Sequence, residues 1–176
     1  MKTKLLYAII FIISFIILPS GFVFSSQSSP EYSDDTEYVY PTVPGTSAWR
    51  SFDSLDCKIN ATQVPPEKLK HMTTRALMET VLNYPLLINM WAFGIYMRDP
   101  QKGDPGFLSV LSYCDSLQEL VKRPDAIEIL KNEFDKLNKK DYEEYIKENR
   151  MDLLNRVTDI ARIITGIKYL NKQEKQ

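Results

Sequence analysis

The sequence predicts an all-α domain, a small irregular bundle of five or six helices. Past Trp49, apolar residues recur at steps of three and four, which is the helical period. The run 38–40 alternates too briefly for a strand and has no second strand to pair with. Helices that each carry one apolar face bury those faces by packing together. A short α-superhelical stack is the alternative, although the helical segments do not align as repeats.

Local signals mark the first two helices of this bundle. A proline pair predicts a short helix over 65–72, because the first turn of a helix does not need the N–H that proline lacks. Thr73 or Thr74 offers a hydroxyl as the N-cap of a second helix, which ends near Tyr84. The sequence therefore predicts two short helices in succession.

The segment 82–97 carries almost no charge and is apolar nearly all round. A helix of this kind is buried on every side. We therefore expect this segment, which contains Trp91, to be the central helix, with the Trp91 ring in the core.

Later helices are separated by proline, glycine and charge. The segment 99–106 reads as a loop, and Asp104 is expected to cap a helix whose apolar stripe continues to Val121. Another helix is expected from Asp125, followed by a polar joint at 139–141. The segment 142–170 then reads as a last helix with an irregularity near residue 149, before a polar tail at 172–176.

The N-terminus has the pattern of an export signal. Lys2 and Lys4 precede the apolar run 5–18, and small residues fit a cut after Ser25. We expect residues 1–25 to be a signal peptide and the protein to be secreted or held at the cell surface. The alternative is an uncleaved membrane anchor, because 5–24 is long enough to span a bilayer.

Between the signal and the helices lies a stretch without helical periodicity. Residues 26–47 are rich in Ser, Asp, Pro and Tyr, which indicates a flexible or extended N-terminal arm. The all-α domain is then expected over 48–171.

Two cysteines, Cys57 and Cys114, are expected outside the cytoplasm, where a disulfide between them would persist. The alternative is two buried free thiols, because Cys114 falls on an apolar stripe. The spacing matches no zinc pattern, and His71 is the only histidine. We therefore expect no metal and no cofactor.

The charge balance bears on the class of partner. The chain has 22 basic and 23 acidic residues, and removing Lys2 and Lys4 leaves 20 against 23. Such a protein lacks the positive charge on which nucleic-acid binding relies. We expect no nucleic-acid partner, and a membrane contact only through the signal segment if it stays uncleaved.

Several short motifs occur together between residues 44 and 134. They are Pro-Gly-Thr-Ser-Ala-Trp at 44–49, Cys57, Met-Thr-Thr-Arg-Ala-Leu-Met-Glu-Thr at 72–80, Asn-Tyr-Pro-Leu at 83–86 and Leu-Gln-Glu-Leu at 117–120. In this combination the chain resembles a group of uncharacterised exported bacterial proteins, over roughly half of its length. The resemblance implies export from a bacterium and supplies no catalytic residues. Segment 142–170 lies beyond it.

No arrangement of nucleophile, base and orienting group is recognisable, so the expected function is an exported non-catalytic interaction module for a protein or a glycan. Trp49, Tyr38 and Tyr40 are the candidate partner contacts, because aromatic faces bury much area at small entropic cost. For Trp49 the alternative is packing onto the first helices.

Two other functions remain open at this stage. One is a hydrolase of cell-wall or extracellular polymer that uses Asp and Glu side chains brought together by the fold. The other is a structural or inhibitory partner of another exported protein. A cleft with two carboxylates of perturbed pKa favours the enzyme, and an exposed apolar patch near Trp49 favours binding.

Overall fold

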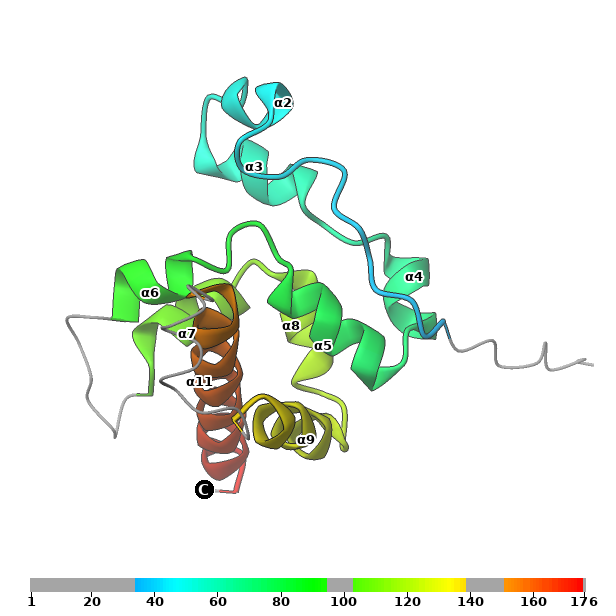
Figure 1. The fold of residues 1–176 in the computed structure, drawn as a ribbon, viewed down its shortest axis with the longest axis vertical. Coiled ribbons are helices and arrows are strands. Elements are labelled where there is room, and N and C mark those ends of the chain that lie inside the picture. The colour runs from blue at the N-terminus through cyan, green and yellow to red at the C-terminus, as the bar shows by residue number, and fades with distance from the viewer. Residues whose placement is uncertain (1–33, 95–102, 139–150, 176) are drawn as a thin grey trace, which may run out of the picture. The chain divides into compact units, whose positions relative to one another are not determined.

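The computed structural model describes residues 34–94, 103–138 and 151–175. In this part of the chain nine helices and no strand are present, five of the helices having seven or more residues, so the all-α prediction is confirmed (Figure 1). The predicted signal peptide and the joint at 139–141 lie outside the described residues, as does the expected irregularity near residue 149. None of the described helices combines the length and apolarity needed to cross a membrane.

Four short helices form the N-terminal half, and three of them begin at a capping hydroxyl. They are α2 (Ser47–Arg50), α3 (Leu55–Ala61), α4 (Pro66–His71) and α5 (Thr74–Leu82). The side chains of Thr46, Ser54 and Thr73 accept hydrogen bonds from the first turns of α2, α3 and α5. The two helices predicted after residue 65 are thus found as α4 and α5, whereas α2 and α3 were not resolved by the sequence pattern.

The prediction of one helix from residue 104 to Val121 is wrong in one respect, because this segment forms two helices. They are α7 (Pro105–Leu111) and α8 (Asp115–Leu120), and α6 (Asn89–Gly94) precedes them. The chain turns at Ser112, and Cys114 is extended (φ −93°, ψ 103°). Asp115 then accepts a 2.6 Å hydrogen bond from the Val64 N–H. This bond joins residues far apart in sequence, so the apolar stripe could not reveal it.

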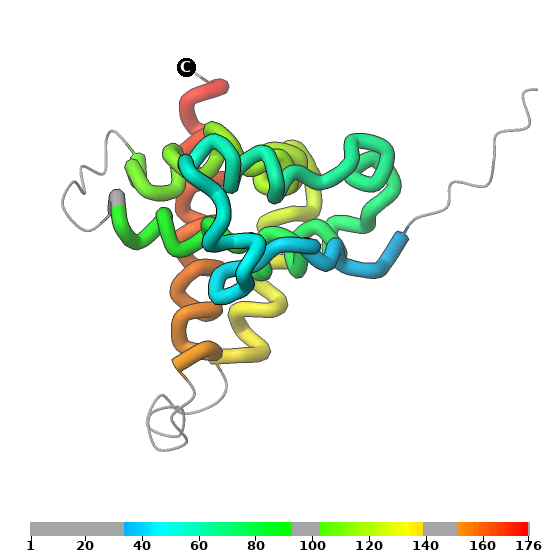
Figure 2. The backbone as a smooth tube through the Cα atoms, turned by 90° about the horizontal axis from the view of Figure 1, so that it is seen from above, coloured from blue at the N-terminus to red at the C-terminus, as the bar shows by residue number. Residues whose placement is uncertain are grey.

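Two longer helices complete the domain. They are α9 (Ala126–Asn138) and α11 (Met151–Gln173), which lie side by side (Figures 1 and 2). The helix expected from Asp125 is therefore found. The predicted polar tail is partly wrong, because α11 continues through residue 173.

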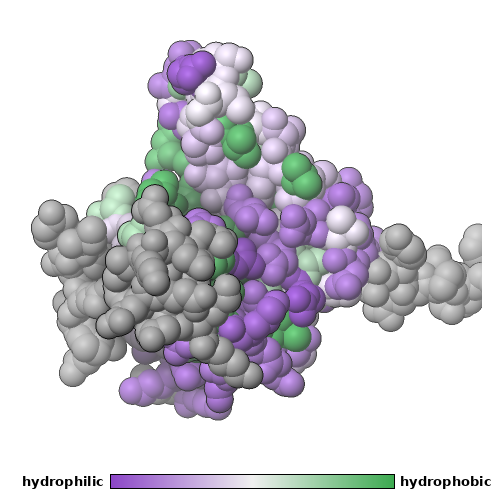
Figure 3. Space-filling view, viewed as in Figure 1, coloured by the Kyte–Doolittle hydropathy of each residue, from purple (hydrophilic) through white to green (hydrophobic). Residues whose placement is uncertain are grey.

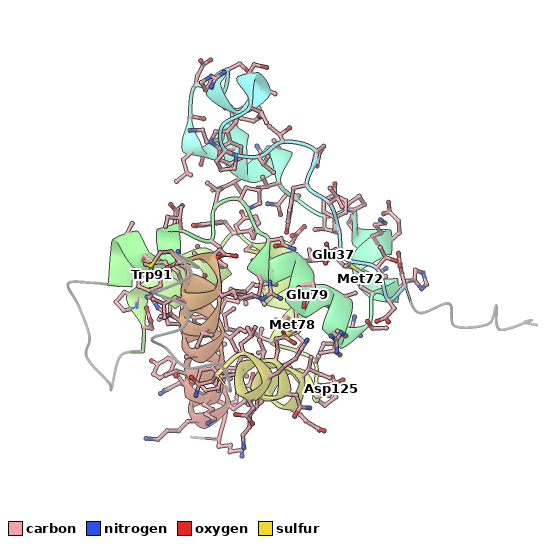
Figure 4. The ribbon with its side chains drawn as sticks, in the orientation of Figure 1. Glu37, Met72, Met78, Glu79, Trp91 and Asp125 are labelled. Carbon is pink, nitrogen blue, oxygen red and sulfur yellow. The ribbon has the colours of Figure 1, made fainter. Side chains whose placement is uncertain are left out.

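The central helix is α5 and not the segment 82–97, of which the structure describes residues 82–94. It contacts α8, α9 and α11, and Leu77 and Val81 are fully buried. Arg156 of α11 pairs with Glu79 of α5. Trp91, labelled on α6 in Figure 4, is only half-buried. The uncharged segment is therefore not surrounded on every side: α6 packs chiefly against α7, and Ile88 just before it is 66% exposed.

Glycine allows α7 and α11 to approach closely. A Cβ added at Gly166 of α11 would lie 2.4 Å from the ring of Phe107, a fully buried residue of α7. A larger side chain at this position would therefore force the two helices apart.

The described part of the arm is extended and bonded to the helices. The Asp34 N–H donates to the His71 carbonyl, and the Thr73 N–H donates to the Asp34 carbonyl, which makes a single parallel bridge. The Tyr38 N–H donates to Thr80 Oγ1 at 2.9 Å. Residues 34–40 are therefore part of the folded domain and not a loose tether.

Candidate functional site

The predicted disulfide is absent. Cys114 is fully buried between α7 and α8, with its Sγ 3.3 Å from Ser116 Oγ, whereas Cys57 is exposed on α3. Because one thiol faces the core and the other faces solvent, neither the disulfide nor the alternative of two buried thiols is correct. Burial raises the pKa of the Cys114 thiol to about 12, so this thiol is unreactive at neutral pH.

Tyr40 is a core residue and not a surface contact. It is 6% exposed, and its hydroxyl donates to the Thr80 carbonyl at 3.3 Å and lies 3.4 Å from Ser116 Oγ. Its ring makes an edge contact with Tyr84, at 5.6 Å between centroids. Burial raises the pKa of the Tyr40 hydroxyl. The prediction of a partner contact at Tyr40 is thus corrected, because this side chain fills the core.

Tyr38 lies at the edge of the same aromatic group. Its ring is half-buried and meets Tyr40 edge-on at 5.2 Å. The Lys68 ammonium lies 5.5 Å from the centre of the Tyr38 ring. Tyr38 therefore keeps some exposed surface while its ring helps to hold the arm.

Trp49 contacts Phe52, which lies between α2 and α3, and Lys58 of α3, and it is half-buried. The Phe52 and Trp49 rings are T-shaped, with 6.1 Å between their centroids, and the Lys58 ammonium lies over the Trp49 ring, 5.5 Å from its centre. These contacts match the alternative of packing for Trp49, and they leave part of the side chain open to solvent.

Exposed aliphatic side chains lie on the arm and at the start of α3. Val39 is 77% exposed, Leu55 46% and Val43 39%. Figure 3 shows hydrophobic spots over this part of the molecule, among more polar surface. We call Val39, Val43, Trp49 and Leu55 the arm–α3 surface. Scattered apolar residues are common on proteins, so the significance of this set lies in its concentration within residues 39–55, the stretch that contains Trp49.

Charges of both signs accompany the arm–α3 surface. Arg50 donates to the Gly45 carbonyl at 3.1 Å, and Lys58 covers Trp49. Asp53 and Asp56 are exposed nearby in the sequence. This surface therefore has no strong net charge that would select a highly charged ligand.

A second cluster joins α6, α7 and α11 and contains two carboxylates. Arg162 donates to both Asp104 oxygens, from Nε at 2.8 Å and from Nη2 at 2.7 Å. The Trp91 indole N–H donates to Asp159 Oδ1 at 2.8 Å, and the Arg162 guanidinium lies 5.6 Å from the Trp91 ring centre. Asp104 also caps α7 by accepting from the N–H groups of Gly106 and Phe107.

The two carboxylates of this cluster are perturbed in opposite directions. Burial raises the pKa of Asp159, and the Trp91 hydrogen bond and the Arg162 charge offset this only in part. Burial acts the same way on Asp104, but the Arg162 and backbone hydrogen bonds outweigh it and lower the pKa. The sequence analysis found the cap at Asp104 and missed the rest. Arg162 beside Ile160 and Ile163 was the available signal, since a charge among apolar residues needs a buried partner.

No metal site is present in the described residues, which contain no group of three or more His, Cys, Asp or Glu side chains suited to a metal ion. We found no family model, curated protein or solved structure that matches the chain. The resemblance to exported bacterial proteins therefore stays a prediction.

Proposed function

We propose that the protein is an exported, non-catalytic interaction module that binds another protein through the arm–α3 surface. The observation that carries the proposal is the exposure of Val39, Val43 and Leu55, which lie in the same short stretch of sequence as the half-buried Trp49. Exposed apolar residues gain free energy when a partner removes them from water. Export rests on the N-terminal sequence pattern alone.

A protein partner fits this surface better than a glycan. Sugar rings stack on open aromatic faces, whereas the Lys58 ammonium lies over the Trp49 ring and the Phe52 ring packs against it in a T-shaped arrangement. The remaining exposed members are aliphatic, and these pack against the apolar side chains of a protein. A structural or inhibitory role toward another exported protein is compatible with the same contact.

The hydrolase alternative would depend on Asp104 and Asp159, whose contacts favour a structural role. Both Asp104 oxygens are bonded to Arg162, and the same carboxylate caps α7. Asp159 accepts from Trp91. An Asp159→Asn variant tests the alternative: loss of polymer hydrolysis at unchanged thermal stability would favour the enzyme over the interaction module.

The proposal is tested by site-specific photo-crosslinking in a bacterial host that exports the full chain. A photoreactive residue at Leu55 should yield a discrete adduct with one protein, whereas the same residue at Lys131, exposed on α9, should not. Leu55→Asp should weaken binding of the identified protein about tenfold. Asn132→Asp adds the same charge on α9 and should leave binding unchanged. Equal labelling at both positions, or none at Leu55, contradicts the proposal.

A further inference from the structure

A pocket of about 330 Å³ lies where the connection from α8 to α9 passes the last turns of α11. Its apolar lining comes from three elements, and the members are Val121, Pro124, Ile127, Ile167 and Leu170. Ile167 is 2% exposed and Ile127 is half-buried. The volume is at the lower end of the range for small-molecule pockets, about 300–1,000 Å³. The pocket therefore has room for a ligand of few atoms.

One side of the pocket carries excess positive charge. Lys122 and Arg123 both line it, and both pair with Glu119, at 3.7 Å and 3.1 Å. Two cations thus share one carboxylate. The Arg123 side chain also donates from Nη2 to the Leu69 carbonyl, and its buried Nε has no hydrogen-bond partner in the part of the chain described. This side is suited to an anionic group.

The part of the pocket lining at the end of α11 is negative. Glu174 and Asn171 line it, and no ion pair of Glu174 is found within the described residues. The last carbonyl groups of the 23-residue helix add partial negative charge at the same place. This side is suited to an ammonium group.

We propose that this pocket binds a small zwitterion with one branched apolar side chain. Its ammonium group lies toward Glu174, its carboxylate toward Lys122, and its side chain against Ile127 and Ile167. This chemistry is that of a free aliphatic amino acid or of a dipeptide made from such residues. A simple fatty acid leaves the Glu174 side unmatched, and a simple amine leaves the Lys122 side unmatched. The site is built by other elements than the arm–α3 surface and does not depend on it.

The test is a methyl NMR titration of the full chain with ¹³C-labelled isoleucine. Leucine should shift the Ile127 and Ile167 methyl signals in a saturable way, with a Kd on the order of 1 mM. Glycine tests the apolar side chain, and 4-methylpentanoate tests the ammonium group; both should bind more weakly. Leucyl-leucine distinguishes a dipeptide ligand from a free amino acid. If it binds more tightly than leucine, the ligand is a peptide, and if it binds more weakly, the ligand is a free amino acid.

Two exposed charges can be removed with little risk to the fold. Lys122→Gln and Glu174→Gln should each weaken leucine binding about two- to five-fold, the usual effect of one solvent-exposed ion pair. Lys131→Gln removes an exposed charge of α9 that does not line the pocket, and it should leave binding unchanged. Absence of saturable shifts would overturn the proposal. Equal binding of glycine and leucine, or unchanged binding in both pocket variants, would also overturn it.

Discussion

The α5 helix and the α2–α3 pair begin with the same kind of cap and contribute to the core very differently. Six of the nine residues of α5 are buried, whereas α2 and α3 contain no buried residue. Thr73 caps α5 just as Thr46 and Ser54 cap the other two. A capping residue therefore shows where a helix begins, and it carries no information on whether that helix is buried.

Like α5 and unlike α2 and α3, the arm contributes to the core, although it has no regular secondary structure. Residues 34–40 form no helix, yet Tyr40 lies in the core and Tyr38 donates to Thr80. An extended segment is thus held more firmly than two regular helices. Burial and tertiary hydrogen bonds, and not regular secondary structure, decide what a segment contributes to stability.

The largest expected effect contrasts a buried arginine of α11 with an exposed arginine of α2. Arg162→Ala should lower the free energy of unfolding by about 3–5 kcal/mol, because it leaves the Asp104 carboxylate without its buried partner. Arg50→Ala removes an exposed arginine of α2 that donates to a carbonyl, and it should cost less than about 0.5 kcal/mol. Urea unfolding of both variants measures the contrast. Equal costs would show that α11 and α2 do not differ in their contribution to stability.

Two neighbouring residues of the arm sharpen the comparison. Tyr40→Ala should cost about 3–4 kcal/mol, comparable to a core aromatic, and Tyr40→Phe about 1 kcal/mol, since only hydrogen bonds are lost. Val39→Ala is the matched control, because Val39 is 77% exposed, and it should cost under about 0.5 kcal/mol. Chemical denaturation decides the matter. A Tyr40→Ala variant as stable as Val39→Ala would show that the arm contributes as little to stability as α2 and α3 do.

Close packing between helices is tested by a smaller change. Gly166→Ala should cost about 1–3 kcal/mol, because the new methyl group would lie 2.4 Å from the Phe107 ring. The neighbouring Thr165 is exposed on the same helix, so Thr165→Ala should be nearly neutral. Thermal unfolding compares the two. A neutral Gly166→Ala would mean that α7 and α11 separate easily.

The smallest expected effect is on the pH dependence of stability. The Asp104 pKa is lowered from 3.8, so its contribution is complete above pH 3.8 and is lost as the pH falls through the lowered pKa. The Asp159 pKa is raised from 3.8, so its contribution declines as the pH rises from 3.8 through the raised pKa. The free energy of unfolding is measured as a function of pH. Asp104→Asn should reduce the loss of stability below pH 3.8, and Asp159→Asn should reduce the loss of stability above pH 3.8. Identical curves for wild type and both variants would contradict these assignments.

Local signals predicted the helical elements well and their places in the fold poorly. The caps at Thr73 and Asp104 were readable because capping involves residues two or three apart. The break before α8 was not readable, because the Asp115–Val64 bond that accompanies it joins residues 51 apart. The prediction of a Cys57–Cys114 disulfide was wrong because it also depended on tertiary structure. The spacing of two cysteines along the chain does not show which of them faces the core.

The candidate surface was predicted in part. Trp49 remains partly open to solvent, but Tyr40 does not, and the exposed Val39 and Leu55 carried no sequence signal that set them apart from core residues. Exposure depends on which faces the other helices cover, and that is a property of the packed domain.

Amide hydrogen exchange of Tyr38 and Arg50 tests the contrast between the arm and α2 most directly. The Tyr38 N–H donates to Thr80 Oγ1 of α5, and the Arg50 N–H donates to the Thr46 carbonyl within α2, a helix of four residues. Tyr38 should exchange only through global unfolding, and Arg50 at least about 100-fold faster through local fraying. A Tyr38 amide that exchanges as fast as that of Arg50 would contradict the account.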